Sequence, residues 1–188
     1  MSLFIAARPD DGAVEDLQDE LDRVRRLPVS RPLRWQPPGL WHVTLAFLGD
    51  PPDDADDVVA ERIEGLCTHD VISGVRIAGS GCFGRQILWM GLEAGAAVDG
   101  LASLAGAIPR LVRGTGTELD RRAWRAHLTV ARARNGDARV VTAALAGYRG
   151  PAWQVEEVLL IRSTGGPQPS HRVVHRVPLA SVRTAPPR

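Results

Sequence analysis

Residues 42–46, His-Val-Thr-Leu-Ala, are matched 85 positions later by residues 127–131, His-Leu-Thr-Val-Ala. Each copy places a histidine and a threonine two residues apart, with aliphatic residues between and after them. Side chains alternate between two faces along an extended strand, so His42 and Thr44 would share one face and the aliphatic residues the other. We therefore predict two strands that bury their aliphatic residues and present an imidazole beside a hydroxyl on the opposite face.

The elements expected around the two copies follow the same order. A strand, a helix, the repeat strand, a helix and another strand are expected in residues 3–79 and again in residues 86–162. Leu3 precedes His42 by 39 positions, and Leu88 precedes His127 by 39 positions. We expect one bilobal α+β domain over residues 1–188, since this length suits a single core or two joined lobes.

The two lobes are expected to be related by a pseudo-two-fold axis. Each would have an antiparallel sheet and two helices, and residues 172–179 would add a final strand. If the two His-x-Thr faces meet across a cleft between the lobes, two imidazoles and two hydroxyls line one pocket.

Apolar periodicity and turn residues place the elements. Strands are expected at residues 3–8, 40–48, 71–79, 86–93, 126–132, 155–162 and 172–179. Helices are expected from Val14, with Val14, Leu17, Leu21 and Val24 inward; after the acidic residues 53–57, with Val58, Val59, Ile63 and Leu66 inward; over 98–112, kinked or ended by Pro109; and over 138–146. Loops or turns are expected at residues 28–38, 82–85, 114–117, 135–137 and 163–170, and a frayed tail at 184–188.

The composition is that of a soluble globular protein, with 44% hydrophobic and 24% charged residues. A net charge of +1 does not suggest a protein that binds polyanions through its bulk field. All 23 basic residues are arginine, so any phosphate would be bound by guanidinium, backbone N–H, histidine or hydroxyl groups.

Cys67 and Cys82 stand alone, without the spacing of a disulfide framework or a zinc site. We interpret them as buried thiols in a reducing compartment. Residues 1–8 are too short an apolar run for a signal peptide, and no segment is long enough to span a bilayer. The expected location is the cytoplasm, and the expected state is a monomer.

Two histidines facing one pocket can act as one general base and one general acid near neutral pH. The hydroxyls of Thr44 and Thr129 can donate hydrogen bonds to the non-bridging oxygens of a tetrahedral anion. Phosphodiester cleavage fits this set of groups, because it needs a base for the nucleophile, an acid for the leaving oxygen and donors for the phosphoryl oxygens. Arg132 is the first candidate for an anion ligand, and Arg172 and Arg176 of the last strand are weaker candidates. Counting by twos places Arg132 on the opposite face from His127 unless the strand bulges.

These residues resemble a known family. The stretches 41–50, Trp-His-Val-Thr-Leu-Ala-Phe-Leu-Gly-Asp, and 127–132, His-Leu-Thr-Val-Ala-Arg, are similar to the motifs of the two-histidine phosphoesterase superfamily. More narrowly, the chain resembles the RNA 2′,3′-cyclic phosphodiesterase branch, historically called 2′-5′ RNA ligase. The resemblance extends over the opening strand at Phe4, the strand over 88–92 and the region 159–179.

The resemblance implies a bilobal α+β fold, a water-filled cleft, and a reaction without metal or cofactor. That reaction opens a 2′,3′-cyclic phosphate at an RNA end to a 2′-phosphate, and some members join or cleave 2′-5′ linkages without ATP. By resemblance, His42 is the proton donor and His127 the proton acceptor, and the partner is an RNA end or nucleotide with a cyclic phosphate. Family members often have an aromatic residue in the last strand, where this chain has His171 and His175.

Other interpretations stay open at this stage. The protein could be an RNA-end-binding module with little turnover, or a phosphodiesterase for small cyclic nucleotides. Arg132 could form a structural ion pair. The segment before the second repeat, which contains Arg121, Arg122 and Arg125, could be a solvated loop rather than a path for RNA. His171, Val173 and His175 alternate as in the repeats, which would suit an exposed strand face, a cleft wall or, less well, a zinc site. His69 is expected at the surface, and Trp35 and Trp41 in the core, at a cleft rim or as stacking residues.

Overall fold

The computed structural model describes residues 1–188 except for 53, 121, 134–135, 166–168 and 181–188. Its helices are α1 (Asp11–Arg25), α2 (Ala55–Ile63), α3 (Ala96–Leu111) and α4 (Thr142–Leu145). Its strands are β1 (Ser2–Ala7), β2 (Leu33–Trp35), β3 (Val43–Phe47), β4 (Ile72–Phe83), β5 (Ile87–Leu92), β6 (His127–Ala133), β7 (Arg149–Val155), β8 (Glu157–Thr164) and β9 (Ser170–Pro178). Short 3₁₀ helices cover Pro28–Ser30, Pro38–Leu40, Glu64–Thr68 and Ala138–Val141.

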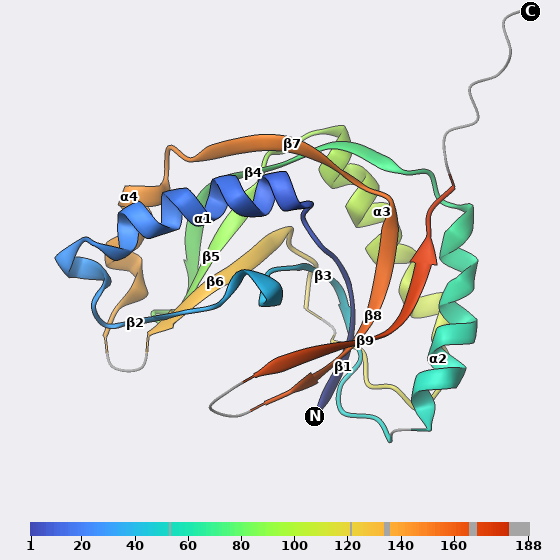
Figure 1. Ribbon diagram of the computed structural model, residues 1–188. Helices are drawn as coiled ribbons and strands as arrows, with labels where there is room; N and C mark the ends of the chain where they lie inside the picture. Colours follow the sequence, from blue (N-terminus) through green and yellow to red (C-terminus); the bar gives the residue numbers. More distant parts are fainter. Residues whose placement is uncertain (53, 121, 134–135, 166–168, 181–188) are drawn as a thin grey trace, which may run out of the picture.

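The described strands form one curled sheet in the order β7-β4-β5-β6-β3-β1-β8-β9, with β2 paired to β6 (Figure 1). All of its named pairs are antiparallel. The two repeat strands, β3 and β6, are neighbours at its centre. The α+β class predicted from the sequence is confirmed.

Two separate cores lie on the helix-covered face of the sheet. In the first, α2 and α3 pack against β1, β3 and β8; in the second, α1 and the segment that contains α4 pack against β5 and β6. Leu17 of α1 thus belongs to the same core as Leu88 and Leu128, and Ile108 of α3 to the same core as Ile5. The helix that follows β1 therefore covers the strands of the second half, and the helix that follows β5 covers strands of the first.

The other face of the sheet is here called the open face, and none of the described α-helices contributes to the apolar cluster on it. A small apolar cluster on β1 and β8 is built from Phe4, Ala6, Leu159 and Ile161, and it contains no residue of a helix. These residues alternate along their strands with residues of the first core, as the period of two along a strand requires.

Each repeat strand contains one extra residue at the same place. Along β1 and β3, Ile5 lies opposite Ala46 and Ala6 opposite Thr44, so β3 advances by two residues while β1 advances by one. Along β5 and β6, Leu88 lies opposite Ala131 and the next residue of β5 opposite Thr129. A bulge of this kind reverses the alternation of side chains beyond it. We interpret the matching bulges as a trace of duplication in the backbone itself.

Helix α2 departs from the predicted orientation. Val59, Ile63 and Leu66 are buried as expected, but Val58 is 44% exposed. Asp56 is buried instead, because its carboxylate pairs with the guanidinium of Arg162 on β8, which is 4% exposed. A buried charge needs a partner of opposite sign, and this need determines which face of α2 turns inward.

Two strands were missed by the sequence analysis. β2 lies within the stretch expected as a loop at residues 28–38, because the prolines on both sides of it masked a three-residue strand. β7 covers residues to which no element was assigned, apart from Val155, and the strand expected at 155–162 is β8, which begins after Glu156. The turn expected at 135–137 falls partly, and the tail at 184–188 wholly, outside the described residues.

Other boundaries also shift. β4 continues through Cys82 and Phe83, which were expected in a turn. α3 continues past Pro109 for two residues and ends at Leu111, since a proline in the last turn costs little of the helical hydrogen bonding. Cys67, expected to be buried, is exposed at the end of a surface 3₁₀ helix, and Cys82 is half-buried. Among the described helices, none is both long and apolar enough to cross a membrane.

Candidate active site

The two His-x-Thr repeats meet where β3 and β6 pair. Val43 lies opposite Leu128 in antiparallel register. Continuing that register by one residue in each direction places His42 opposite Thr129, and Thr44 opposite His127. Side chains directly opposite are ~5 Å apart at Cβ, and diagonal neighbours such as the two histidines are roughly 7–8 Å apart. By this register each histidine would lie across from the threonine of the other repeat.

Both imidazoles are oriented by the same backbone contact. The Nδ1 atom of His42 donates to the carbonyl oxygen of Leu40 at 2.7 Å, and Nδ1 of His127 donates to the carbonyl oxygen of Arg125 at 2.8 Å. In each case the acceptor lies two residues before the histidine. A carbonyl oxygen only accepts, so Nδ1 holds the hydrogen and Nε2 is left for chemistry.

The surroundings of the two histidines differ. His42 stacks on the ring of Phe4 with centroids 4.7 Å apart, and the ring of His171 meets it edge-on at 5.0 Å. Burial, helped by the positive charges of His171, Arg8 and His127, lowers the pKa of His42 to about 4, although the hydrogen bond to the Leu40 carbonyl acts in the opposite direction.

His127 is flanked instead by the rings of Phe83, at 4.8 Å, and Trp89, at 6.3 Å. Burial lowers its pKa below the usual value, and the charge of Arg125 acts in the same direction. Without a ligand, both imidazoles are therefore neutral near pH 7, and His42 takes up a proton less readily than an exposed histidine.

The two threonines lie on the open face beside the histidines. Both are half-buried. The backbone of Thr44 is fixed because its carbonyl oxygen accepts a hydrogen bond from Nε1 of Trp124 at 2.8 Å. Within the described part of the chain, neither threonine hydroxyl has a hydrogen-bond partner, so both are available to a ligand.

Arg132 lies on the same face as His127 and Thr129, because the bulge in β6 reverses the alternation between them. The burial pattern of β6 agrees: Leu128, Val130, Ala131 and Ala133 are buried, while Arg132 is exposed. Simple counting by twos gave the opposite face. Among the described residues no carboxylate pairs with Arg132, so its role as a structural ion pair is not supported.

His171 and His175 lie on opposite faces of β9, contrary to the alternation expected from the sequence. A register shift between Leu160 and Ile161 of β8 gives β9 an extra residue between the two histidines. His171 therefore contacts His42 and Phe4 on the open face, while Nε2 of His175 pairs with Glu64. Burial, and then the charge of Arg8, lowers the pKa of His171 to about 4.

The remaining candidates lie in varied positions. Arg172 pairs with Asp56 at 3.5 Å and Arg176 with Glu157, so neither is a strong candidate for a phosphate ligand. Trp41 is in the core, Trp35 is half-buried under the guanidinium of Arg25, and Arg122 pairs with Asp120. Arg121 lies outside the described residues. No group of three or more histidine, cysteine, aspartate or glutamate side chains in the described chain could hold a metal ion.

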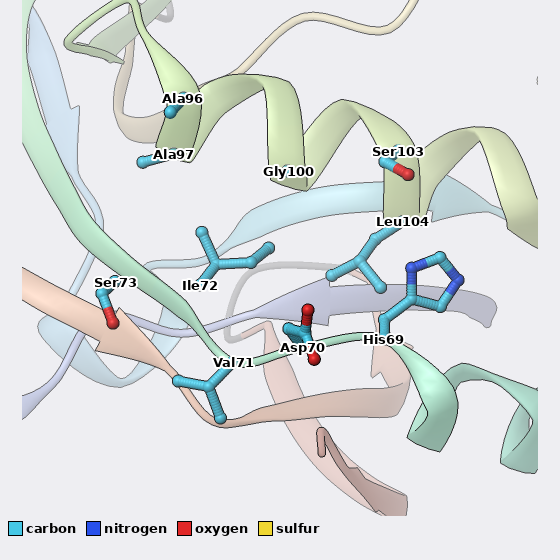
Figure 2. A pocket seen from close by; sticks show the side chains of 10 residues that line it. All are labelled: His69, Asp70, Val71, Ile72, Ser73, Ala96, Ala97, Gly100, Ser103 and Leu104. Carbon is cyan, nitrogen blue, oxygen red and sulfur yellow. The ribbon is translucent and has the colours of Figure 1, made fainter. Parts of the chain in front are cut away.

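A hollow of about 360 Å³ lies away from the repeats, between the start of β4 and α3 (Figure 2). Its wall includes His69 and Asp70, while Ile72 and Leu104 form its floor. No residue of either His-x-Thr repeat lines it. His69 therefore lies at the rim of this hollow, and the hollow is separate from the histidine pair.

The fold and the paired repeats together define a class of protein, a duplicated α+β phosphoesterase-like scaffold with one histidine from each half. The family model described as the 2′-5′ RNA ligase superfamily matches residues 9–167. The chain belongs to this superfamily.

An RNA 2′,3′-cyclic phosphodiesterase from Geobacillus stearothermophilus is 29% identical over 145 residues, which cover 74% of this chain and 45% of that protein. The matched chain therefore spans less than half of that relative. Two solved structures are similar in fold. TT0787 of Thermus thermophilus has a TM-score of 0.70 at 22% identity, covering 97% of this chain and 100% of that one. Apo LigT of E. coli has a TM-score of 0.75 at 17% identity, covering 95% of this chain and 97% of that one. LigT has also been solved in complex with 3′-AMP.

Proposed function

We propose that this protein hydrolyses the 2′,3′-cyclic phosphate at RNA ends to a 2′-phosphomonoester, with His42 as proton donor and His127 as proton acceptor and without a metal ion. The observation that supports this most directly is the pairing of Val43 with Leu128, because the same register, extended by one residue each way, would bring each repeat histidine across from the threonine of the other repeat. The superfamily match and the name of the Geobacillus relative agree with it.

In the proposed reaction, Nε2 of His127 takes a proton from water, and the water oxygen attacks phosphorus. The bond from phosphorus to the ribose O3′ breaks, and O3′ takes a proton from Nε2 of His42. The hydroxyls of Thr44 and Thr129 donate to the two non-bridging oxygens, where negative charge increases in the transition state. Arg132, on the same face, provides the guanidinium for the phosphate or for the next phosphate of the RNA.

The low pKa of His42 bears on this division of roles. At pH 7 a histidine with a pKa of about 4 is neutral, whereas a proton donor must be protonated. The negative phosphate placed between the two imidazoles raises the pKa of both, so the donor takes up its proton together with the substrate. Arg8 and His171 oppose that uptake at His42, and this is the main argument for the reverse assignment.

An enzyme explains the site better than an RNA-end-binding module does. A binding module needs hydrogen-bond donors for the phosphate, but it has no need for two imidazoles held in the same tautomer by matching carbonyl contacts. The ability to join RNA through a 2′-5′ linkage belongs to the same proposal, because it is this reaction with a ribose hydroxyl in place of water.

The test is product analysis. The protein is incubated with an oligonucleotide that ends in a 2′,3′-cyclic phosphate and, separately, with the four 2′,3′-cyclic mononucleotides. We expect 2′-phosphate products, faster turnover of the oligonucleotide, and no product from His42→Ala or His127→Ala within the same time. Formation of 3′-phosphate, or equal turnover by the histidine variants, would refute the mechanism. Turnover of the mononucleotides alone would favour the small-nucleotide phosphodiesterase.

A further inference from the structure

An aromatic surface lies next to His127 on the open face. It is built from Phe83 at the end of β4 and Trp89 of β5, whose ring centroids are 5.4 Å apart and tilted by 38°. The guanidinium of Arg125 lies 5.8 Å from the centre of the Phe83 ring and 5.5 Å from that of Trp89. Both rings are half-buried, and Arg125 is exposed. The surface therefore borders the repeat histidine on one side and solvent on the other.

The position of Trp89 depends on a glycine across the strand pair. Gly81 lies opposite Trp89, and a Cβ atom at that position would come within 2.2 Å of the indole ring. The indole therefore lies flat on the backbone of β4. Its buried Nε1 atom has no hydrogen-bond partner among the described residues.

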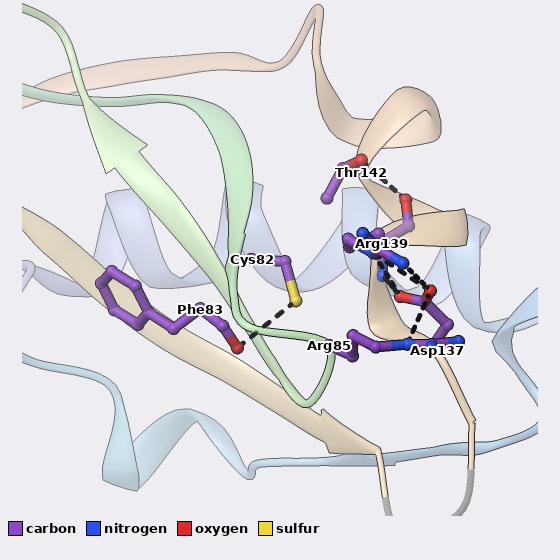
Figure 3. Close-up of polar contacts among 6 residues, drawn as sticks. All are labelled: Cys82, Phe83, Arg85, Asp137, Arg139 and Thr142. Atoms are coloured by element: carbon purple, nitrogen blue, oxygen red, sulfur yellow. Dashed lines mark hydrogen bonds and ion pairs between the residues drawn. The ribbon is translucent and has the colours of Figure 1, made fainter.

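The hairpin that carries Phe83 is held by ion pairs on the side opposite to the Phe83 ring. Arg85, two residues after Phe83, pairs with Asp137 at 3.2 Å, and Asp137 also pairs with Arg139. In Figure 3 these three side chains lie on one side of the hairpin, while the ring of Phe83 points to the other. The backbone N–H of Ala138 also donates to the carbonyl oxygen of Arg85 at 2.8 Å. The aromatic surface is thus held in place before any ligand binds.

On the opposite side of the site, the described residues offer no equivalent surface. Beside His42 the ring of Phe4 is 4% exposed, because it is covered by His42 and His171. Arg125 also differs from its neighbour in the same loop. Arg122 is paired with Asp120, whereas no carboxylate in the described chain pairs with Arg125. An accessible pair of rings under an unpaired guanidinium is suited to a nucleobase, which stacks on aromatic faces and on guanidinium planes.

We propose that Phe83, Trp89 and Arg125 bind the base of a second nucleoside, the one whose hydroxyl replaces water at His127. This inference rests on the proposed function, in which the nucleophile enters on the His127 side. The proton of the nucleoside 5′-hydroxyl passes to Nε2 of His127, and O5′ forms a bond to phosphorus. The bond to O3′ breaks, and O3′ takes the proton of His42. The cyclic phosphate supplies the bond that is exchanged, so no other reactant is needed.

The first experiment measures how the reaction partitions between two nucleophiles. A cyclic-phosphate oligonucleotide is incubated with excess adenosine, and the ratio of 2′-5′-linked product to 2′-phosphate is measured. We expect Phe83→Leu and Arg125→Gln to lower this ratio by ~10-fold or more, the size of a lost stacking contact. Arg122→Gln removes a similar charge from the same loop and is the matched control, with an unchanged ratio.

If both reactions fall in parallel, the surface binds the base of the cyclic phosphate's own nucleoside or only supports His127, and the proposal is wrong. The proposal is also wrong if adenosine raises the KM of the cyclic-phosphate oligonucleotide as a competitive inhibitor, because a second nucleoside must bind together with the first.

The second experiment does not depend on turnover. Binding of adenosine to the wild-type protein is followed through the NMR signal of the Trp89 indole N–H, assigned by comparison with Trp89→Phe. We expect adenosine to shift this signal, with at least a ~5-fold weaker affinity in Arg125→Gln than in Arg122→Gln, again the size of a lost stacking contact. No shift, or equal affinities, would overturn the proposal. A shift without any turnover of cyclic phosphates would support the nucleoside site while refuting the proposed hydrolysis.

Discussion

The rate of cyclic phosphate hydrolysis should depend on pH in a way set by the burial of the two repeat histidines. The active form of the free protein has one histidine neutral and the other protonated, so kcat/KM is greatest between their two pKa values. Burial lowers the pKa of His42 to about 4 and that of His127 below the usual value. We therefore expect kcat/KM to be greatest below pH ~6.5, the ordinary pKa of histidine.

The magnitude follows from the fraction of molecules in the active form. With a pKa of about 4, His42 is protonated in roughly one molecule in 1,000 at pH 7. Above pH 6.5, where His127 is neutral, kcat/KM should fall ~10-fold per unit as protonated His42 is lost, and lowering the pH from 7 should raise kcat/KM until His127 itself takes up a proton. In the complex the phosphate anion raises both pKa values, so the optimum of kcat should lie at higher pH than that of kcat/KM.

The assay is steady-state hydrolysis of a 2′,3′-cyclic nucleotide between pH 4 and 9. Folding must be followed in parallel by circular dichroism, because the same burial affects stability. His42 and His171 bind protons in the unfolded chain from pH ~6.5 downward but in the folded protein only near their pKa of about 4. Stability should therefore fall as the pH drops through this window. An optimum of kcat/KM at or above pH 7 in folded protein would refute the reasoning.

The leaving group distinguishes the donor from the acceptor. A phosphodiester with a 4-nitrophenolate leaving group needs no proton donor, because the phenolate is already a stable anion. On this substrate we expect His42→Ala to lose less than ~10-fold, while His127→Ala loses ~100- to 10,000-fold. A large loss in His42→Ala and a small loss in His127→Ala would make His127 the donor and His42 the acceptor. The low pKa of His42 would favour that reverse assignment. If both variants lost activity to the same large extent on the cyclic phosphate and on the 4-nitrophenyl diester, neither histidine would act only as a proton donor.

Four further results are expected. Thr44→Val and Thr129→Val should each reduce kcat/KM on the order of 10- to 1,000-fold, and an unchanged rate would show that the hydroxyls only fill space. Arg132→Lys should impair turnover, because an ammonium cannot reproduce the two-pronged contact of a guanidinium; wild-type kinetics would exclude Arg132 from the site. Activity should persist in excess EDTA, and loss that Mn²⁺ or Mg²⁺ restores would contradict a metal-free reaction. Asp56→Asn should lower the free energy of unfolding by ~1–3 kcal/mol in urea titrations, since it removes the negative charge that faces the buried guanidinium of Arg162; no change would show that the charge of Asp56 is replaceable.

Local periodicity was sufficient to predict how the two repeats lie in the sheet. His42, Thr44, His127 and Thr129 lie on paired strands because a period of two within five residues determines both which side chains are buried and which are presented. The α+β class followed from the alternation of strands and helices, and it required no knowledge of tertiary contacts.

The parts that could not be predicted lie beyond bulges. A bulge adds one residue and reverses the alternation, yet the residue it adds, Leu45 or Val130, is an ordinary aliphatic residue of a strand. Counting by twos therefore failed for Arg132 and for His171 with His175. Long-range pairs were equally hidden. The burial of Asp56 depends on Arg162, 106 residues away, and no local pattern contains that information.

The two halves of the site have kept their backbone and changed their surroundings. The bulge, the threonine two residues after the histidine and the carbonyl two residues before it are the same at His42 and His127. Two identical imidazoles in identical surroundings would titrate alike, and an acid–base pair works best when its members differ. Here the difference comes from neighbours outside the repeats: Phe4 and His171 enclose one histidine, and an open aromatic surface borders the other. The duplication in the sequence therefore locates the candidate site, while the divergence around it gives the two histidines the different surroundings that the proposed acid and base roles need.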